Sequence, residues 1–196
     1  AEFKYSAVSP NPIFQNAVIS GNFRPRAGFG LPSALFDVND ARLNFYLTTP
    51  DATVGGETLK TIRGFFDAQT KAIPIYLPDE MRLIRAEAQL RLNGAAGITA
   101  AVTDIDAVRT QATGDPFGVH ANLPAYAGPL TVADVLLEVY RQRSAELFLT
   151  GLRFEDSRRF GRPDPTVTLI ERNRNFYPYP VLERNNNANT PNDPAI

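Results

Sequence analysis

The side chain best suited to catalysis near neutral pH in this sequence is a single histidine, His120. Imidazole has an ordinary pKa of about 6.5, so a general base or a Ser-His-Asp triad would have to use this residue. No G-x-S-x-G nucleophile elbow accompanies it, and one histidine cannot form the H-E-x-x-H zinc motif. His120 stands among small residues in a loop, which favours a surface or ligand-contacting role.

Two other patterns resemble chemical motifs but lack a necessary member. Gly28 and Gly30 begin a glycine-rich stretch, yet Ser33 stands where a dinucleotide fingerprint has its third glycine, and no P-loop lysine follows. Asp104 and Asp106 are two residues apart in a predicted helix, so they point to different faces and do not form a carboxylate pair. The sequence therefore predicts no enzyme, no cofactor and no metal site.

A group of charged residues gathers around the predicted helices after residue 131. Arg143 interrupts an apolar stripe, Glu146 follows three residues later, and Arg153, Asp156 and Arg159 recur at helical spacing. These side chains could hold an anionic ligand, or they could form an ion-pair network that locks two helices. The sequence favours the network, because every arginine has a carboxylate within reach and buried charges require partners.

Aromatic side chains outside the helical stripes are the best candidates for ligand contact. The loop of residues 115–130 carries Phe117, His120 and Tyr126 within ten residues of each other. A tyrosine ring can stack on a sugar while its hydroxyl makes a hydrogen bond, whereas Phe117 could instead pack onto the helices as a plug. The predicted ligand-binding residues are Phe23, Phe29, Phe117, His120 and Tyr126.

Composition limits the class of protein further. The chain has 196 residues, 43% of them hydrophobic, which suffices for one domain with a core. Lys and Arg (20) nearly balance Asp and Glu (21), so no strong field favours nucleic acid. The chain has no cysteine, which excludes disulfides, thiolate zinc sites and a lipid-modified cysteine within this segment.

The elements that must position these residues are mainly helical. Residues 1–33 show no persistent period and predict an irregular loop region, while the Ile-, Phe- and Tyr-rich residues 59–77 predict one or two strands. Apolar spacing and helix-end signals within 79–161 predict helical hairpins of the TPR type joined by long loops. We expect no fixed structure in the asparagine-rich tail, 185–196.

Four helices are expected in that region, each with a recognisable beginning or end. The first follows Pro78 and ends at Gly94, and the second begins near Ile98 and stops near Gly114. The third runs from Val132 to about Thr150, and the fourth covers 153–160. The short connection between the first two predicts that they run antiparallel.

Several stretches occur in the order found in a known family. EMRLIRAEAQLRLNG, DIDAVRTQA and YRQRSAELFLTGLRFEDSRRFG are similar to the C-terminal helices of the SusD/RagB family. NDARLNFY and NFYPYPVLERNNN resemble further elements of that family. The third stretch is the most specific, and the residues that meet its pattern are Arg143, Glu146, Leu147, Gly151, Arg153, Phe154, Asp156 and Arg159.

The resemblance implies a non-enzymatic function in nutrient uptake. Members of the SusD/RagB family are lipoproteins on the external face of the outer membrane that bind oligosaccharides, or in some cases peptides. They work beside a SusC-like TonB-dependent transporter. Because members are usually longer and carry a lipid anchor that this segment lacks, we expect the chain to be the C-terminal part of such a protein. Thr150, Ser157 and Ala188 depart from the pattern.

Two other functions remain open from the sequence. A free-standing helical-repeat scaffold would bind a protein or peptide on its concave face. A glycoside hydrolase needs only two carboxylates, which can converge from distant segments without a sequence signature. The chain has no tryptophan, so any sugar stacking within it must use tyrosine or phenylalanine.

Overall fold

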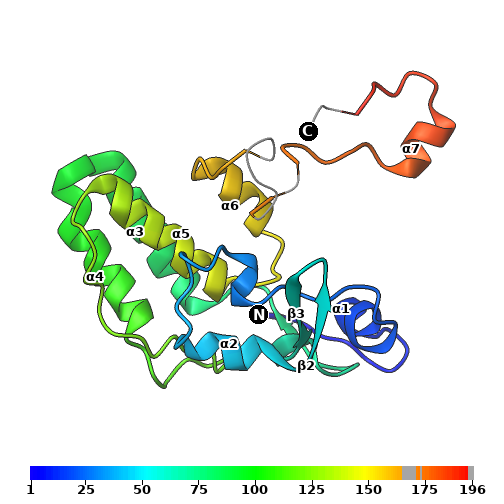
Figure 1. The fold of residues 1–196 in the computed structure, drawn as a ribbon, viewed down its shortest axis with the longest axis horizontal. Helices are drawn as coiled ribbons and strands as arrows, with labels where there is room; N and C mark the ends of the chain where they lie inside the picture. Colours follow the sequence, from blue (N-terminus) through cyan, green and yellow to red (C-terminus); the bar gives the residue numbers. More distant parts are fainter. Residues whose placement is uncertain (165–170, 173, 194–196) are drawn as a thin grey trace. The chain divides into compact units, whose positions relative to one another are not determined.

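The computed structural model describes residues 1–164, 171–172 and 174–193. The chain divides into two compact units, Ala1–Arg153 and Phe154–Ile196. Helices account for 43% of the described residues and strands for 10%, which confirms the predicted mainly α fold with little strand. Figure 1 shows the helical layer of the first unit and the small strands beside it. Within the described residues, none of the helices combines the length and the apolar character that a membrane span requires.

The first unit is built on three helices that lie side by side, α3 (Pro78–Asn93), α4 (Ile98–Arg109) and α5 (Val132–Glu146) (Figure 1). They bury apolar side chains at spacings of three and four residues, as the sequence predicts. The core residues at 0 to 1% exposure are Leu83, Ala86 and Leu90 of α3, Ala101, Ile105 and Val108 of α4, and Val135, Val139 and Tyr140 of α5.

The turn between α3 and α4 depends on glycine. Gly94 adopts a φ of 56°, which ends α3 as predicted. A Cβ added at Gly97 would lie 2.2 Å from the carbonyl oxygen of Gln89, so the chain can return this closely only with glycine there. The predicted helical hairpin is confirmed, and the tight turn at Gly94 and Gly97 allows its two helices to pack closely.

Two helices end earlier than the sequence predicts. α4 stops at Arg109 rather than near Gly114, because the following loop takes over its backbone hydrogen bonds: the N–H of Leu123 donates to the carbonyl of Arg109 at 2.7 Å. α5 stops at Glu146 rather than near Thr150, and Leu149 leaves the helical region with a φ of 61°. Helix-end signals in the sequence do not report such tertiary contacts.

The other side of the first unit carries a hairpin. The short helix α2 (Ala41–Tyr46) leads directly into β2 (Leu47–Val54), which pairs antiparallel with β3 (Glu57–Ile62). β1 (Glu2–Phe3) pairs with β4 (Ile73–Pro74) in a second small sheet. Residues 59–77 thus contain two strands, but a 3₁₀ turn at Gly64–Phe66 separates them.

The first 33 residues are not wholly irregular, contrary to prediction. They include β1 and the helical turns α1 (Pro12–Phe14) and Gln15–Ile19. The Asn11 side chain accepts hydrogen bonds from the N–H groups of Ile13 and Phe14, and donates to the carbonyls of Phe65 and Lys71. Turns this short show no periodicity, and their stability comes from such distant contacts.

An aromatic cluster joins α2, the 3₁₀ turn and the residues after α5. Tyr46 is 0% exposed, and its ring meets Phe65 and Phe148 edge-on at 6.0 and 5.5 Å. The Tyr46 hydroxyl donates to the carbonyl of Glu146 at 3.1 Å. Edge-to-face contacts of this kind stabilise beyond burial alone, so the cluster fixes α2 against the end of α5.

The second unit is smaller and contains α7 (Val181–Asn186), with α6 (Arg153–Arg159) at its beginning. The rings of Phe154 and Tyr177 lie 4.4 Å apart, and Arg172 donates to the carbonyls of Ser157 and Arg162. α6 confirms the predicted fourth helix to within one residue. α7 extends into the beginning of the tail for which the sequence predicts no fixed structure, and residues 194–196 of that tail lie outside the described residues.

Candidate functional site

A groove of about 450 Å³ opens on the first unit between residues 27–38, α2 and the β2–β3 hairpin. Its volume falls within the roughly 300–1,000 Å³ of small-molecule sites. The lining residues are Ala27, Gly28, Phe36, Val38, Leu43, Asn44, Leu47, Thr48, Thr49, Lys60 and Arg63. Apolar side chains form one part of this groove, and amide, hydroxyl and cationic groups form the rest.

The aromatic side of the groove is held by a close contact. Gly28 has a φ of 65°, and a Cβ built on it would come within 2.3 Å of the Phe36 ring. Only glycine therefore lets Phe36 lie against this backbone. The sequence marks Gly28 as part of an incomplete phosphate motif, whereas the structure gives it a packing role.

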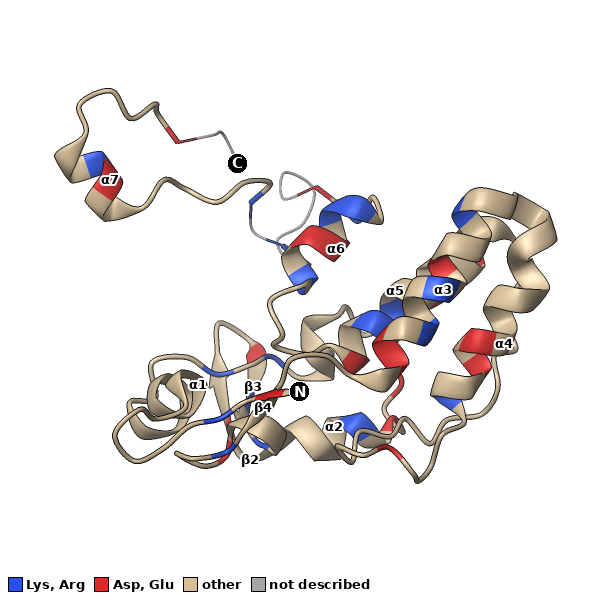
Figure 2. Cartoon of the chain, turned by 180° about the vertical axis from the view of Figure 1, so that it is seen from behind, with Lys and Arg blue, Asp and Glu red and all other residues tan. Residues whose placement is uncertain are grey.

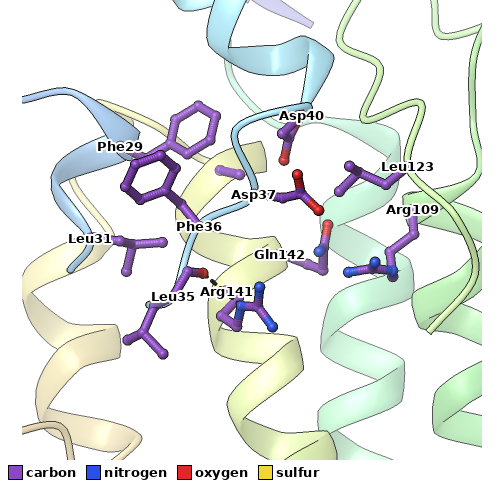
Figure 3. A pocket seen from close by; sticks show the side chains of 11 residues that line it. Phe29, Leu31, Leu35, Phe36, Asp37, Asp40, Arg109, Leu123, Arg141 and Gln142 are labelled. Atoms are coloured by element: carbon purple, nitrogen blue, oxygen red, sulfur yellow. Dashed lines mark hydrogen bonds between the residues drawn. The ribbon is translucent and has the colours of Figure 1, made fainter. Parts of the chain in front are cut away.

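Two other hollows are smaller than the groove. One of about 220 Å³ has both polar and apolar surface and includes Tyr76, Glu80 and Leu152 in its lining. Another, drawn in Figure 3, has room for about 10 Å³, which admits at most one water molecule. The groove is therefore the best candidate for a ligand of several heavy atoms.

The small cavity of Figure 3 lies over a buried charged network. Asp40 caps α2 by accepting from the backbone N–H of Arg42, and also accepts from its guanidinium at 2.6 Å. Arg42 is 0% exposed and donates to Glu146 Oε2 at 3.1 Å and to Gln142 Oε1 at 2.6 Å. One arginine thus ties α2 to the last turn of α5.

The network continues from Gln142 towards α4. The Gln142 amide donates to Glu138 Oε1 at 2.8 Å, and Glu138 pairs with both Arg109 and Arg141. Arg109 donates to the carbonyl of Pro124 at 2.9 Å, which anchors the loop that follows α4. Because each of these buried ions has a partner, the network positions α2, and with it the groove, on the helices.

Burial shifts the pKa of several groups in this region. Burial raises the pKa of Glu146 to about 7, although the charge of Arg42 opposes the shift. Burial also raises the pKa of Asp79 above its usual range. Burial lowers the pKa of Arg42, but Asp40 and Glu146 raise it more, so that it lies above its ordinary value and the guanidinium stays charged.

The structure separates the predicted ligand residues. Phe29 is 3% exposed and packs edge-on against Phe148 at 5.7 Å, so its ring belongs to the core. Phe117 packs against the core beside Phe65, which agrees with its alternative role as a plug. Phe23 is 44% exposed.

The other two predicted residues, His120 and Tyr126, lie half-buried in the loop after α4. The Tyr126 hydroxyl donates to the carbonyl of Pro129 at 3.0 Å, and its backbone N–H donates to Asp106 at 2.6 Å. The loop is thus folded onto the helices. None of the five predicted residues lines the groove.

Of the predicted ion-pair residues, two pair with each other and one pairs with a residue outside the predicted set. Glu146 pairs with Arg42, and Asp156 pairs with Arg159 at 2.6 Å. Arg143 is buried at 5% exposure, whereas the guanidinium of Arg153 lies 5.2 Å from the centre of the Tyr140 ring. Sequence reasoning missed Arg42, and the only signal for it is its place two residues after Asp40 in NDARL.

The charged residues form neither a metal site nor a surface of one charge in the described part of the chain. Acidic and basic residues are interspersed along α3 and α5 (Figure 2), in keeping with a net charge of −1. In the part of the chain that the structure describes, no three His, Asp or Glu side chains are grouped so as to hold a metal ion.

A comparison with protein families matches residues 66–194 to the SusD family, which is more than half of the chain. No curated protein and no solved structure matches. Members of this family are in general non-catalytic nutrient-binding proteins that accompany TonB-dependent transporters, typically at the outer membrane. The helical frame and the ordered C-terminal motifs agree with the match, and the chain belongs to the SusD family.

Proposed function

We propose that this chain captures an oligosaccharide on the external face of the outer membrane and passes it to a SusC-like TonB-dependent transporter. The observation that carries the proposal is the groove of about 450 Å³ in a member of a nutrient-binding family. Its apolar part suits the face of a sugar ring, and Asn44, Thr48 and Thr49 offer groups for hydroxyls. A peptide is the alternative ligand.

Binding without turnover agrees with where the carboxylates lie. Glycoside hydrolysis needs two carboxyl groups on either side of the scissile bond. No Asp or Glu lines the groove, and Asp40, Glu138 and Glu146 are buried in contacts with arginine. The groove therefore supports a binding protein better than a glycosidase.

The loop after α4 is proposed as a second contact surface. His120 and Tyr126 are both partly exposed, and Tyr126 keeps part of its ring available for stacking. Phe23, exposed at 44%, is a further candidate. This loop is a weaker candidate than the groove because the Tyr126 hydroxyl already donates a hydrogen bond to the carbonyl of Pro129.

Titration calorimetry with a panel of oligosaccharides and peptides tests the proposal. Asn44 is exposed in the groove, so Asn44→Trp should block the groove without disturbing the core. Val54→Trp, 64% exposed at the end of β2 and outside the groove, is the matched control. We expect the blocked variant to lose most of its affinity and the control to keep it.

Two outcomes would count against the groove. Equal affinities of the two tryptophan variants would remove it from the site, and a loss in Tyr126→Ala or His120→Ala would then move the site to the loop. If no oligosaccharide or peptide binds the wild-type chain, the proposed function itself fails.

A helical-repeat scaffold is a second candidate because α3 has an apolar stripe on its outer face. Met81, Ile84 and Leu92 are 50, 45 and 82% exposed at spacings of three and eight residues. Hydrogen exchange separates the two functions. Ligand-induced protection around the groove supports nutrient capture, and protection confined to α3 and α4 supports a scaffold.

A further inference from the structure

We infer that the groove selects an acidic saccharide, one whose rings carry a carboxylate. This inference rests on the proposed function and adds to it the chemical class of the ligand. It starts from the charges of the lining, which includes Lys60 and Arg63 but no Asp or Glu. A concave surface with two cations and no carboxylate favours an anion over a neutral sugar.

The two cations differ in how far their charge is already balanced. Lys60 donates to Asp51 Oδ2 at 2.7 Å, and this ion pair offsets much of its charge. Arg63 is exposed, and its guanidinium makes no hydrogen bond or ion pair with any described residue. Arg63 is therefore the group with a full charge to offer to a ligand.

The backbone holds Arg63 in place while its side chain remains free. Its N–H donates to the carbonyl of Tyr46 at 2.7 Å, and the next residues, Gly64, Phe65 and Phe66, are all buried. Arg63 thus stands at a fixed point at the edge of the groove. A planar guanidinium matches a carboxylate with two parallel hydrogen bonds, a geometry that a neutral hydroxyl does not reproduce.

The rest of the lining fits a sugar ring better than an extended acidic peptide. Phe36, Leu43 and Leu47 provide one apolar surface, and Thr48 and Thr49 add hydroxyls beside it. A pyranose ring has an apolar face and several hydroxyls, so a uronate residue can use all three kinds of group at once. A neutral sugar would leave Arg63 bound only to water.

The experiment compares acidic oligosaccharides with their neutral counterparts by titration calorimetry. The probes are tetrasaccharides of galacturonate, of guluronate and of glucuronate-containing chains, each also with its carboxyl groups reduced to alcohols. We expect at least one acidic probe to bind about tenfold tighter than its reduced form, because hydrogen bonds to charged groups have that magnitude. Added salt should weaken only the acidic form.

Variants then assign the difference to Arg63. Arg63→Gln should remove most of the preference for the acidic form, because it should weaken the acidic form much more than the reduced form. Lys4→Gln, which removes one positive charge from an exposed residue outside the groove, is the control and should change neither. Lys60→Gln should have a smaller effect than Arg63→Gln, because Asp51 already pairs with Lys60.

Four results would overturn the inference. Equal binding of acidic and reduced probes, or an Arg63→Gln variant that loses both equally, means that the groove reads neutral sugars and leaves the proposed function standing. If acidic peptides bind and no acidic saccharide does, the ligand class is an acidic peptide and not an acidic saccharide. Absence of binding by every saccharide and peptide removes the inference and the proposed function together.

Discussion

At the scale of single residues, Arg42 connects α2 to the last turn of α5. Its guanidinium is fully buried between Asp40 and Glu146, and it also donates to Gln142. Arg42→Met keeps an unbranched apolar stem but leaves both carboxylates without their cation. Breaking a buried ion pair from one side costs about 3–5 kcal/mol, and we expect that loss in the free energy of unfolding measured with urea.

An exposed ion pair of the same unit provides the comparison for Arg42. Lys71 and Asp67 lie 4.0 Å apart with side chains 49 and 41% exposed. Lys71→Met should change the free energy of unfolding by less than about 1 kcal/mol, as is usual for surface pairs. If Arg42→Met lowers the free energy of unfolding no more than Lys71→Met does, the buried network does not stabilise the fold.

Glu146 should make the stability of the first unit depend on pH. Its pKa rises from an ordinary 4.5 to about 7 in the folded state, chiefly through burial. The folded chain therefore binds this proton more tightly than the unfolded chain, and stability should fall as pH rises from about 4.5 to about 7. Over that window the contribution is on the order of 3 kcal/mol.

The measurement is urea unfolding of the wild type and Glu146→Gln at pH 5 and pH 8. Glutamine has no proton to lose, so the variant should show a smaller decrease in stability between the two pH values. The comparison is needed because Asp79, whose pKa burial also raises, contributes in the same direction. An identical decrease in both proteins would mean that Glu146 is not the titrating group.

At the scale of elements, the sequence predicts what local periodicity determines. The helices at Pro78–Asn93, Ile98–Arg109 and Val132–Glu146 bury their apolar residues at spacings that are visible without a structure. Helix ends set by tertiary contacts, and the helical turns near Asn11, have no such signal. The end of α4 depends on the later loop residue Leu123, and the turns near Asn11 depend on partners more than 50 residues away, such as Phe65.

The candidate site was less accessible from the sequence than the helices. The groove combines residues near Gly28, near Asn44 and near Arg63, and no local pattern shows that these three segments meet. The same holds for Arg42, whose partner Glu146 is 104 residues away. The sequence shows where charged and aromatic residues occur along the chain, but it does not show which of them are in contact in the folded structure.

The contact between Gly28 and Phe36 gives a prediction for the wall of the groove. Gly28→Ala should displace the Phe36 ring. Gly30→Ala is the matched control, because the Gly30 φ of 69° is similar to the 65° of Gly28 but a Cβ there would meet no neighbouring atom. Both variants pay the cost of a left-handed alanine, about 1 kcal/mol. We expect the first alone to lose a further 1–3 kcal/mol in unfolding and to weaken ligand binding.

Unfolding curves and calorimetric titration of the two alanine variants check this expectation. Equal stability and equal affinity would indicate that Phe36 moves freely and does not form a fixed wall. If Gly28→Ala lowers stability but not affinity, Phe36 contributes to folding and not to ligand binding.

At the scale of the whole molecule, the groove and the charged network belong to one unit. Ala1–Arg153 contains the three helices, the hairpin, the groove and the network from Asp40 to Arg109. The helices provide a rigid frame, and loops and a short hairpin on that frame form the concave surface. This division of roles is common in binding proteins and agrees with the general function of the SusD family.

The central claim is that the chain binds a saccharide and does not cleave it. The most direct measurement incubates the purified chain with the acidic and neutral tetrasaccharides, follows binding by calorimetry, and analyses the recovered sugar by chromatography. We predict saturable binding, abolished by Asn44→Trp, with the tetrasaccharide recovered intact. Shorter products with new reducing ends would contradict the claim in favour of a glycosidase, and the absence of any binding would contradict it altogether.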